Sequence, residues 1–304
     1  MIAIAIHGGA GTLRKSDMTD ALEIEYKLGL ERALEVGFNI LKKGGRSIDA
    51  VESAVFELEN YPLFNAGKGS VFNSEGKHEM DASIMEGKDL KAGAVSGVSN
   101  IKNPVLLARA VMEKTEHVLL SGEGAFQFAK QVGISIESDA YFYNEFRHQQ
   151  WLEIKDSDAF KLDHSEKKFG TVGAVALSED GNLAAATSTG GMTNKKFGRV
   201  GDSPIIGIGT YANNNTCAVS CTGHGELFIR SVVAYDISCL MEYKGLTLHE
   251  ACNIVVYDKL VKIGGEGGLI AIDQGGNIEM PFNSEGMFRG AINTNGERTI
   301  MIYK

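Results

Sequence analysis

The chain has 304 residues, 43% of them hydrophobic, with 37 glycines and only 4 prolines. This length is sufficient for a substantial buried core, and the low proline content argues against a disordered, low-complexity chain. The net charge of −9 disfavours nucleic acids and anionic membranes as partners, and a carboxylate-bearing substrate would need a local cation to hold it.

The N-terminal residues and the cysteines favour a reduced, cytoplasmic compartment. The apolar run 1–6 lacks a charged segment before it and reaches a glycine-rich motif too soon for a signal peptide. No apolar run approaches the ~18 residues of a membrane span. All four cysteines lie in the last third of the chain without the spacing of a zinc site, so the sequence predicts no metal or other cofactor for catalysis.

The first 132 residues contain both strand and helix patterns. Apolar residues predict a buried strand over 1–6, followed by a glycine-rich loop over 7–12. Helical periodicity covers 21–43, 48–59, 104–115 and 122–132, and strand-like segments lie near 79–86 and 91–98. Between the second helix and these strands, Pro62 begins a loop that contains several glycines.

Residues from about 138 to 168 are charged and weakly patterned. Such a stretch without clear elements is unusual in a compact domain and is typical of a functional or linker segment. Because it ends immediately before Gly170-Thr171, we expect a flexible linker over about 138–170 that presents this peptide bond for cleavage.

A β-hairpin follows the linker. The apolar runs 172–177 and 183–189 flank Asp180-Gly181, a dipeptide strongly associated with tight hairpin turns. A turn centred there places Thr171 opposite or diagonal to Thr189, with Cβ atoms roughly 4.5–8 Å apart. The sequence therefore predicts two threonine hydroxyls together at the open end of a buried hairpin.

The remaining segments complete a block-like pattern. Strands are predicted near 205–211 and 217–222, helices over 226–243 and 248–262, a second hairpin over 268–278, and strands near 286–292 and 299–303. Because strands and helices come in blocks rather than in strict alternation, we expect an α+β fold with two stacked sheets flanked by helices.

Thr171 is the candidate nucleophile. A threonine hydroxyl requires an adjacent base, and cleavage of the Gly170–Thr171 bond would free an α-amino group with a reference pKa of about 7.7–8. Gly170 suits such cleavage because glycine adopts strained backbone conformations that expose its carbonyl. The alternative is an ordinary threonine at the start of a strand.

Other motifs supply candidate binding groups. Arg199 and Asp202 could clamp the carboxylate and ammonium of an α-amino acid, although this spacing is also typical of a surface salt bridge. Residues 222–225 join a strand to a helix, where a hydroxyl and free N–H groups either hold an oxyanion or form a capping turn. Asn65 either donates its amide to that oxyanion or stabilises its own loop.

Taken in order, these motifs resemble the plant-type L-asparaginases, also called isoaspartyl peptidases, of the N-terminal-nucleophile hydrolase superfamily. The resemblance covers nearly the whole chain. It rests on the motifs His7-Gly8-Gly9-Ala10-Gly11, Pro62-Leu63-Phe64-Asn65-Ala66-Gly67, His78-Glu79-Met80-Asp81-Ala82-Ser83-Ile84-Met85, Gly170-Thr171-Val172-Gly173, Thr187-Ser188-Thr189-Gly190-Gly191, Gly198-Arg199-Val200-Gly201-Asp202-Ser203-Pro204 and Thr222-Gly223-His224-Gly225-Glu226.

The resemblance implies a single four-layer αββα domain over 1–304, made as a precursor. Cleavage before Thr171 would give an α-subunit, 1–170, and a β-subunit, 171–304, that stay intertwined. Thr171 would be the nucleophile and its freed amine the base. Thr189 would hydrogen-bond the nucleophile, and Thr222 with Asn65 would stabilise the oxyanion.

The resemblance also implies ligands and assembly. Arg199 would bind the substrate α-carboxylate and Asp202 its α-ammonium, helped by the backbone at Gly223 and Gly225. The processed αβ units would form a homodimer. A structural sodium or potassium ion would be ringed by backbone carbonyls of Leu58, Glu59, Tyr61, Phe64, Ala66 and Lys68.

We therefore expect an amidohydrolase that cleaves L-asparagine and β-aspartyl dipeptides through a threonine acyl-enzyme. One alternative is a glycosylasparaginase or a threonine endopeptidase of the same superfamily. The absence of a secretion signal and of a cysteine framework disfavours the first, and the short loops disfavour the second. Another alternative is a non-catalytic amino-acid-binding protein, which would keep the clamp and never cleave.

Overall fold

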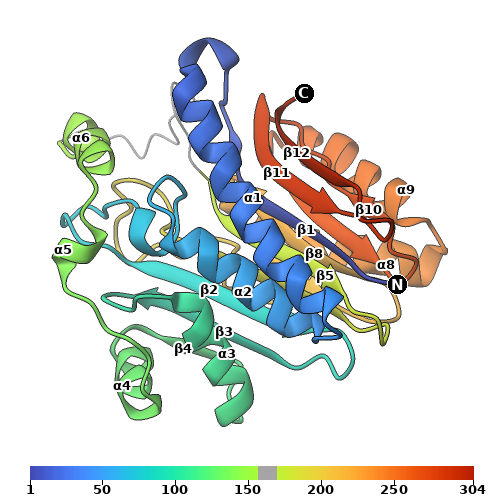
Figure 1. The fold of residues 1–304 in the computed structure, drawn as a ribbon. Helices are drawn as coiled ribbons and strands as arrows, with labels where there is room; N and C mark the ends of the chain where they lie inside the picture. The colour runs from blue at the N-terminus through green and yellow to red at the C-terminus, as the bar shows by residue number, and fades with distance from the viewer. Residues whose placement is uncertain (157–169) are drawn as a thin grey trace.

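The computed structural model describes residues 1–156 and 170–304 as four stacked layers of helices, sheet, sheet and helices (Figure 1). The larger sheet has the strand order β12-β11-β1-β5-β6-β2-β3-β4, antiparallel except for the parallel pair β3 and β4. The bounds of its strands are β1 Ala3–Gly11, β2 Met80–Glu86, β3 Ala92–Val98, β4 Leu119–Ser121, β5 Val172–Leu177, β6 Leu183–Thr189, β11 Gly286–Ile292 and β12 Arg298–Tyr303.

The smaller sheet packs on one face of the larger one. Its strand order is β10-β9-β8-β7, and all its pairs are antiparallel. The bounds of its strands are β7 Thr210–Ala212, β8 Cys217–Gly223, β9 Gly267–Asp273 and β10 Ile278–Glu279.

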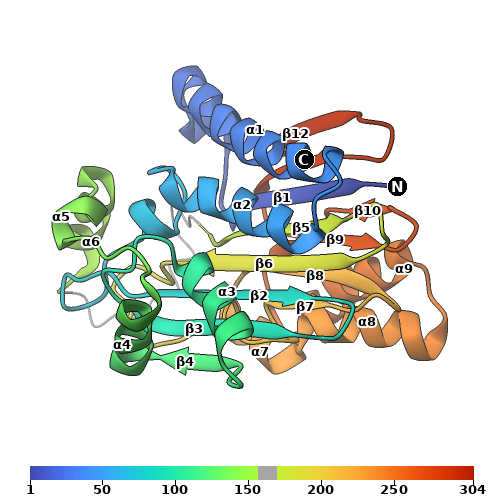
Figure 2. The ribbon, with the colours of Figure 1, turned by 60° about the horizontal axis from the view of Figure 1, so that its bottom comes forward.

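Helices cover the outer faces of both sheets (Figure 2). Over the larger sheet lie α1 Asp20–Lys42, α2 Ser47–Asn60, α3 Pro104–Lys114 and α4 Gly122–Val132. Over the smaller sheet lie α7 Gly225–Ser231, α8 Val233–Lys244 and α9 Leu248–Asn253, which continues through the π-helical turn η3 Ile254–Lys259 into α10 Leu260–Lys262. The short helices η1 Lys15–Asp17, η2 Gly67–Gly69, α5 Asp139–Phe142 and α6 Glu145–Ile154 lie in connections.

The central strands are buried on both faces. In β1, Ile4 and Ile6 face the core beneath the helices, whereas Ala3 and Ala5 face the core between the two sheets. This two-sided burial explains why the run 1–6 is continuously apolar rather than alternating.

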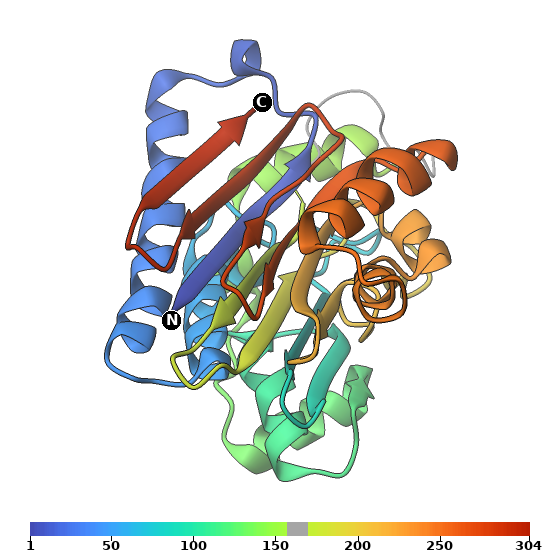
Figure 3. The same ribbon diagram turned by 90° about the vertical axis from the view of Figure 1, so that its right-hand side faces the viewer.

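Groups of strands from before and after Gly170 are interleaved in the larger sheet. β1 lies between β5 and β11 and pairs with both, so segments distant in the chain share one ladder (Figure 3). A break at Gly170–Thr171 would therefore leave two chains joined by common β-sheet hydrogen bonds.

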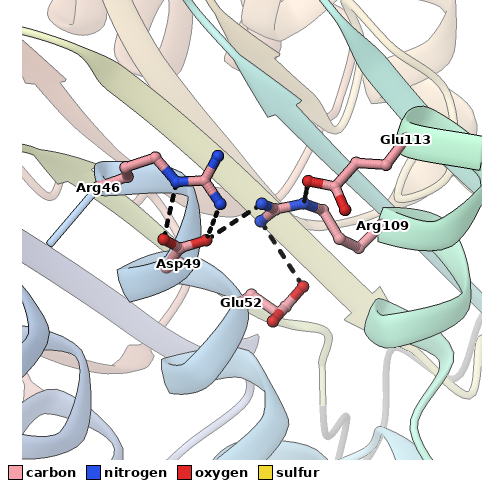
Figure 4. A network of polar contacts seen from close by, with 5 residues as sticks. All are labelled: Arg46, Asp49, Glu52, Arg109 and Glu113. Carbon is pink, nitrogen blue, oxygen red and sulfur yellow. Dashed lines mark hydrogen bonds and ion pairs between the residues drawn. The ribbon is translucent and has the colours of Figure 1, made fainter.

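A buried arginine ties α2 to α3 on the outer face of the larger sheet (Figure 4). The side chain of Arg109 is 8% exposed, and its guanidinium contacts Asp49 at 3.1 Å, Glu113 at 2.6 Å and Glu52 at 3.6 Å. Arg46 adds a second contact to Asp49 at 2.7 Å. Because a buried charge is costly without partners, these ion pairs fix the relative positions of the two helices.

Several predicted elements need correction. Residues 7–12 are not simply a loop, because β1 continues to Gly11 through a bulge between His7 and Gly9, where pairing with β11 satisfies the glycine-rich backbone. The stretch 138–168 is not without elements, because α5 and α6 form within it. The part of the predicted linker over 157–169 lies outside the described residues.

Two further boundaries differ from expectation. The helix predicted over 226–243 is two helices, separated at Val232, whose φ of 50° lies in the left-handed region. The strand predicted near 205–211 is only β7, and the short edge strand β4 was not predicted. Within the described residues, no helix combines the length and the apolar character needed to cross a bilayer.

Candidate active site

The hydroxyls of Thr171 and Thr189 meet at the open end of the β5–β6 hairpin. Val172 pairs with Ser188, so the preceding residue Thr171 lies beside Thr189. The Thr171 hydroxyl donates to Thr189 Oγ1 at 3.1 Å, and Thr189 also accepts the N–H of Gly191 at 3.0 Å. The predicted juxtaposition of the two threonines is confirmed, and both side chains are buried.

Thr222, at the end of β8, lies against the peptide bond between Gly170 and Thr171. Its Oγ1 accepts the N–H of Thr171 at 3.3 Å and that of Ala10 at 3.2 Å. A Cβ atom at Gly170 would lie 2.6 Å from this oxygen, and one at Gly9 would lie 2.7 Å from the Gly170 nitrogen. Glycine at both positions therefore lets three chain segments approach the candidate cleavage site.

Two further side chains contact Thr171, and sequence analysis assigned a role to neither. Ser203 Oγ lies 3.3 Å from Thr171 Oγ1. The Nδ1–H of His7 donates to the Thr171 carbonyl at 2.9 Å, while Nε2 lies 2.9 Å from Ser220 Oγ. Burial lowers the pKa of His7 to about 3, so the ring is neutral, with Nε2 free to accept from the serine hydroxyl.

From Ser220, buried hydroxyls continue between the two sheets. Ser220 Oγ lies 2.7 Å from Thr187 Oγ1, which contacts Thr210. The Ser83 Oγ atom lies 2.7 Å from Thr210 Oγ1 and 2.6 Å from the Ser203 carbonyl oxygen, so Ser83 extends the network to Ser203. The sequence carries a local signal for this network. Thr187 and Thr189 lie two residues apart on one strand, so their side chains share a face. The same holds for Ser220 and Thr222 on another strand.

Asn65 lies beside this cluster, next to the turn that follows Thr189. Its Nδ2 donates to the Gly191 carbonyl at 2.8 Å, and its Oδ1 accepts the N–H of Val71 at 3.1 Å. Its backbone carbonyl accepts the N–H of Gly190 at 3.0 Å. Asn65 is therefore joined to Thr189 through the Gly190–Gly191 turn.

Arg199 and Asp202 lie together, as the predicted clamp requires. Arg199 donates from Nε and Nη2 to the two carboxylate oxygens of Glu226 at 2.8 and 2.9 Å. Asp202 is buried, which raises its pKa to about 7, and its Oδ2 lacks a hydrogen-bond partner within the described parts of the chain. A buried carboxylate oxygen without a donor is suited to an incoming ammonium group.

Gly225 forms the wall of this clamp. A Cβ atom there would lie 2.8 Å from Asp202 Oδ1 and 2.9 Å from Arg199 Nη2. Gly223 ends β8 opposite Gly267 with a φ of 155°, and it links Thr222 to the clamp. Because Ser203 directly follows Asp202, the clamp and the threonine cluster are adjacent.

The six residues of the predicted cation ring lie at the end of α2 and in the loop after it. The carbonyls of Leu58, Tyr61, Phe64 and Ala66 each accept one local N–H, which leaves a second lone pair on each oxygen. A Cβ atom at Gly67 would lie 2.5 Å from the Glu59 carbonyl oxygen. This loop, dense in neutral carbonyl oxygens, fits a hard monovalent cation by the chemistry of its donors.

Comparison with known proteins places this geometry in a family. A family model described as asparaginase matches residues 1–302. The chain is 54% identical over 292 residues to an isoaspartyl peptidase of Escherichia coli strain K12, covering 94% of this chain and 91% of that protein.

Eukaryotic proteins match over similar lengths. A protein of Dictyostelium discoideum named putative isoaspartyl peptidase/L-asparaginase is 49% identical over 322 residues, covering 95% of this chain and 92% of that protein. An isoaspartyl peptidase/L-asparaginase of Bos taurus is 45% identical over 285 residues, covering 93% of this chain and 91% of that protein. The chain therefore belongs to the asparaginase family of N-terminal-nucleophile hydrolases.

Proposed function

We propose that this protein hydrolyses the side-chain amide of L-asparagine and the β-aspartyl bond of isoaspartyl dipeptides, with Thr171 as nucleophile. The observation that carries the proposal is the meeting of Thr171 with Thr189, Ser203 and Thr222 beside the buried Asp202 carboxylate. The names of the relatives, isoaspartyl peptidase and L-asparaginase, support the same chemistry.

The first step is cleavage of the chain itself. The Thr171 hydroxyl attacks the Gly170 carbonyl carbon, the C–N bond breaks, and an ester forms between the two residues. Water then hydrolyses this ester, leaving a carboxylate on Gly170 and a free α-amine on Thr171. The shared β-sheet ladder supports continued association of the two subunits after this step.

In the mature enzyme, the Thr171 amine takes the proton of its own hydroxyl, which attacks the substrate's side-chain carbonyl. Thr222 and Asn65 stabilise the oxyanion. The proton passes to the leaving nitrogen, which departs as ammonia or as an amino acid and leaves a β-aspartyl ester on Thr171. Water hydrolyses the ester, and aspartate is released.

The clamp explains the choice of carbonyl. Arg199 binds the α-carboxylate and Asp202 the α-ammonium, assisted by the backbone at Gly223 and Gly225, so the side-chain carbonyl is the group presented to Thr171. The leaving group lies outside the clamp. We therefore expect β-aspartyl dipeptides to be hydrolysed at least as well as asparagine.

Three accompanying features are proposals as well. The carbonyls of the loop after α2 would hold a sodium or potassium ion as a structural group, and no cofactor would enter the chemistry. The processed αβ units would form a homodimer, for which the exposed Tyr243 and Tyr257 of the outer helical layer offer apolar surface. The four free cysteines, three of them buried, favour a cytoplasmic location.

Turnover by purified protein, incubated until chain cleavage is complete, tests the function. We expect ammonia from L-asparagine and leucine from β-Asp-Leu. Hydrolysis of glycosylated asparagine with neither of these activities would favour the glycosylasparaginase alternative. Reversible aspartate binding without turnover of any of these compounds would favour a binding protein.

A further inference from the structure

Arg147, on α6, is a buried cation that contacts the loop carrying Asn65. It is 1% exposed. Its Nε donates to the Gly69 carbonyl and its Nη2 to the Leu63 carbonyl, both at 3.1 Å. The planar guanidinium therefore spans the loop and binds it on both sides of Asn65, at positions 63 and 69.

The rest of α6 contacts the same loop region (Figures 1 and 2). Asn144 caps the helix by accepting the N–H of Arg147 at 3.2 Å, and its Nδ2 donates to the Pro62 carbonyl at 3.1 Å. Farther along, the Trp151 ring lies 6.0 Å from the Phe72 ring. The helix thus contacts the chain from position 62 to position 72, with Arg147 as its most buried polar group.

The loop in turn determines where the Asn65 amide points. Its Oδ1 is held by the Val71 N–H within the loop, and its Nδ2 reaches the Gly191 carbonyl at 2.8 Å. Gly191 is also the residue whose N–H binds Thr189. A shift of the 63–69 backbone would therefore move the amide relative to the Thr171–Thr189 pair.

From these contacts we infer that Arg147 is a positioning residue for the reaction, acting through Asn65. The inference rests on the proposed function, in which Asn65 donates to the oxyanion. An oxyanion donor must lie within about 2.7–3.1 Å of its target, and displacement by about 1 Å costs on the order of 100-fold in rate. Two hydrogen bonds from the planar guanidinium of Arg147 provide that restraint, whereas the ammonium of a flexible lysine side chain would not.

The test compares kcat and KM for L-asparagine per cleaved chain in Arg147→Met and Arg147→Lys. We expect Arg147→Met to lower kcat by roughly 10- to 100-fold with KM nearly unchanged, because a misplaced oxyanion donor affects the transition state rather than binding. Arg147→Lys is expected to retain an intermediate kcat, since lysine supplies the charge but not the fork.

Arg289→Met is a matched control. Arg289 is also a buried arginine that donates to backbone carbonyls, those of Met287 at 2.9 Å and Tyr303 at 3.0 Å, but on β11. We expect this variant to lose thermal stability and to keep the wild-type kcat. Equal losses of kcat in the Arg147 and Arg289 variants would mean a general structural role and would overturn the inference.

A double-mutant cycle provides the decisive readout. In an Asn65→Ala background, Arg147→Met should change kcat by less than about twofold, because the residue through which it acts is gone. Full additivity of the two effects, or wild-type kcat in folded Arg147→Met, would overturn the inference. Failure of the wild-type enzyme to turn over either substrate would instead overturn the proposed function, so the two failures are distinguishable.

Discussion

His7 and Thr171, 164 residues apart in the chain, are joined by a hydrogen bond from Nδ1–H to the Thr171 carbonyl at 2.9 Å. The contact connects the glycine-rich end of β1 to the residue at the candidate cleavage site. After cleavage, the same bond would join the two subunits, because the Thr171 carbonyl stays with the β-subunit. The His7 imidazole thus links the pairing of β1 within the sheet to the placement of the nucleophile.

Replacing His7 by alanine is expected to slow chain cleavage by about tenfold and to lower the free energy of unfolding by about 2–3 kcal/mol, since two buried polar groups lose a partner. Because the pKa of His7 is about 3, we also expect no inflection from this ring in the cleavage rate between pH 5 and 8. Gel densitometry against time measures the cleavage rate and its dependence on pH, and urea unfolding measures the loss of stability. His117→Ala, at an exposed position, is the control. Cleavage at the wild-type rate in His7→Ala would contradict the role assigned to the ring.

Replacing Thr171 by alanine is expected to abolish both cleavage and hydrolysis, because one hydroxyl performs both. Intact mass after a day at neutral pH should show two fragments starting at Met1 and Thr171 in the wild type, and one uncut chain in the variant. Thr171→Ser, which keeps a hydroxyl, should still cleave. Cleavage in Thr171→Ala, or an uncut wild type, would overturn self-processing.

The affinity for L-aspartate should depend on the ionisation of Asp202. Burial raises the pKa of this carboxyl to about 7, so it is neutral below that pH and charged above it. Because only the charged form attracts the α-ammonium, we expect the inhibition constant of aspartate to rise about tenfold per unit as pH falls below 7. Asp202→Asn should weaken binding and flatten the profile. Asp236→Asn, at a surface ion pair with Lys259, should leave the inhibition constant of aspartate and its pH profile unchanged.

Adding one methyl group at Gly225 should disable the clamp. The new Cβ atom would lie 2.8 Å from Asp202 Oδ1 and 2.9 Å from Arg199 Nη2, closer than van der Waals contact allows. We expect Gly225→Ala to raise KM for asparagine at least tenfold while chain cleavage proceeds. Gly124→Ala is a matched control, because a Cβ atom there meets nothing within 4 Å. Unchanged KM in Gly225→Ala would argue against this binding site.

Removing Arg109 should destabilise the fold without affecting catalysis. Arg109→Met removes the buried cation shared by three partly exposed carboxylates, and we expect the free energy of unfolding to fall by about 2 kcal/mol. Urea unfolding of the uncut Thr171→Ala chain measures this change, with the exposed ion-pair residue Arg298→Met as control. A smaller loss in Arg109→Met than in Arg298→Met would contradict the role of the network.

The difference in unfolding free energy between the wild type and Arg109→Met should depend on pH. Burial favours a raised pKa of Asp49, but hydrogen bonds from Arg46 and Arg109 hold it below its usual range. A carboxyl with a lowered pKa stabilises the fold at neutral pH, and that contribution disappears as acid protonates it. The gap between wild type and Arg109→Met should therefore narrow from pH 6 toward pH 3.

The pairing of Thr171 with Thr189 was predictable because a hairpin is a local structure. Asp180-Gly181 specifies the turn, and the turn sets the register of every residue pair along both strands. The motif around Arg199 and Asp202 was likewise recognisable, since both groups lie in one short segment. For the threonine pair, interactions between residues close in the chain determine the geometry, whereas Arg199 is also held by Glu226, 27 residues farther along the chain.

The contacts of His7, Ser203 and Thr222 with Thr171 could not be derived in this way. They require β1 to pair with β5 and the smaller sheet to pack on the larger one, and each joins residues far apart in the chain. The same packing converts the glycine-rich segment after Ile6 into a strand, because β11 supplies hydrogen-bond partners that its own neighbours lack. Local patterns thus specified the chemical groups, and the stacking of the two sheets brought them together around one hydroxyl.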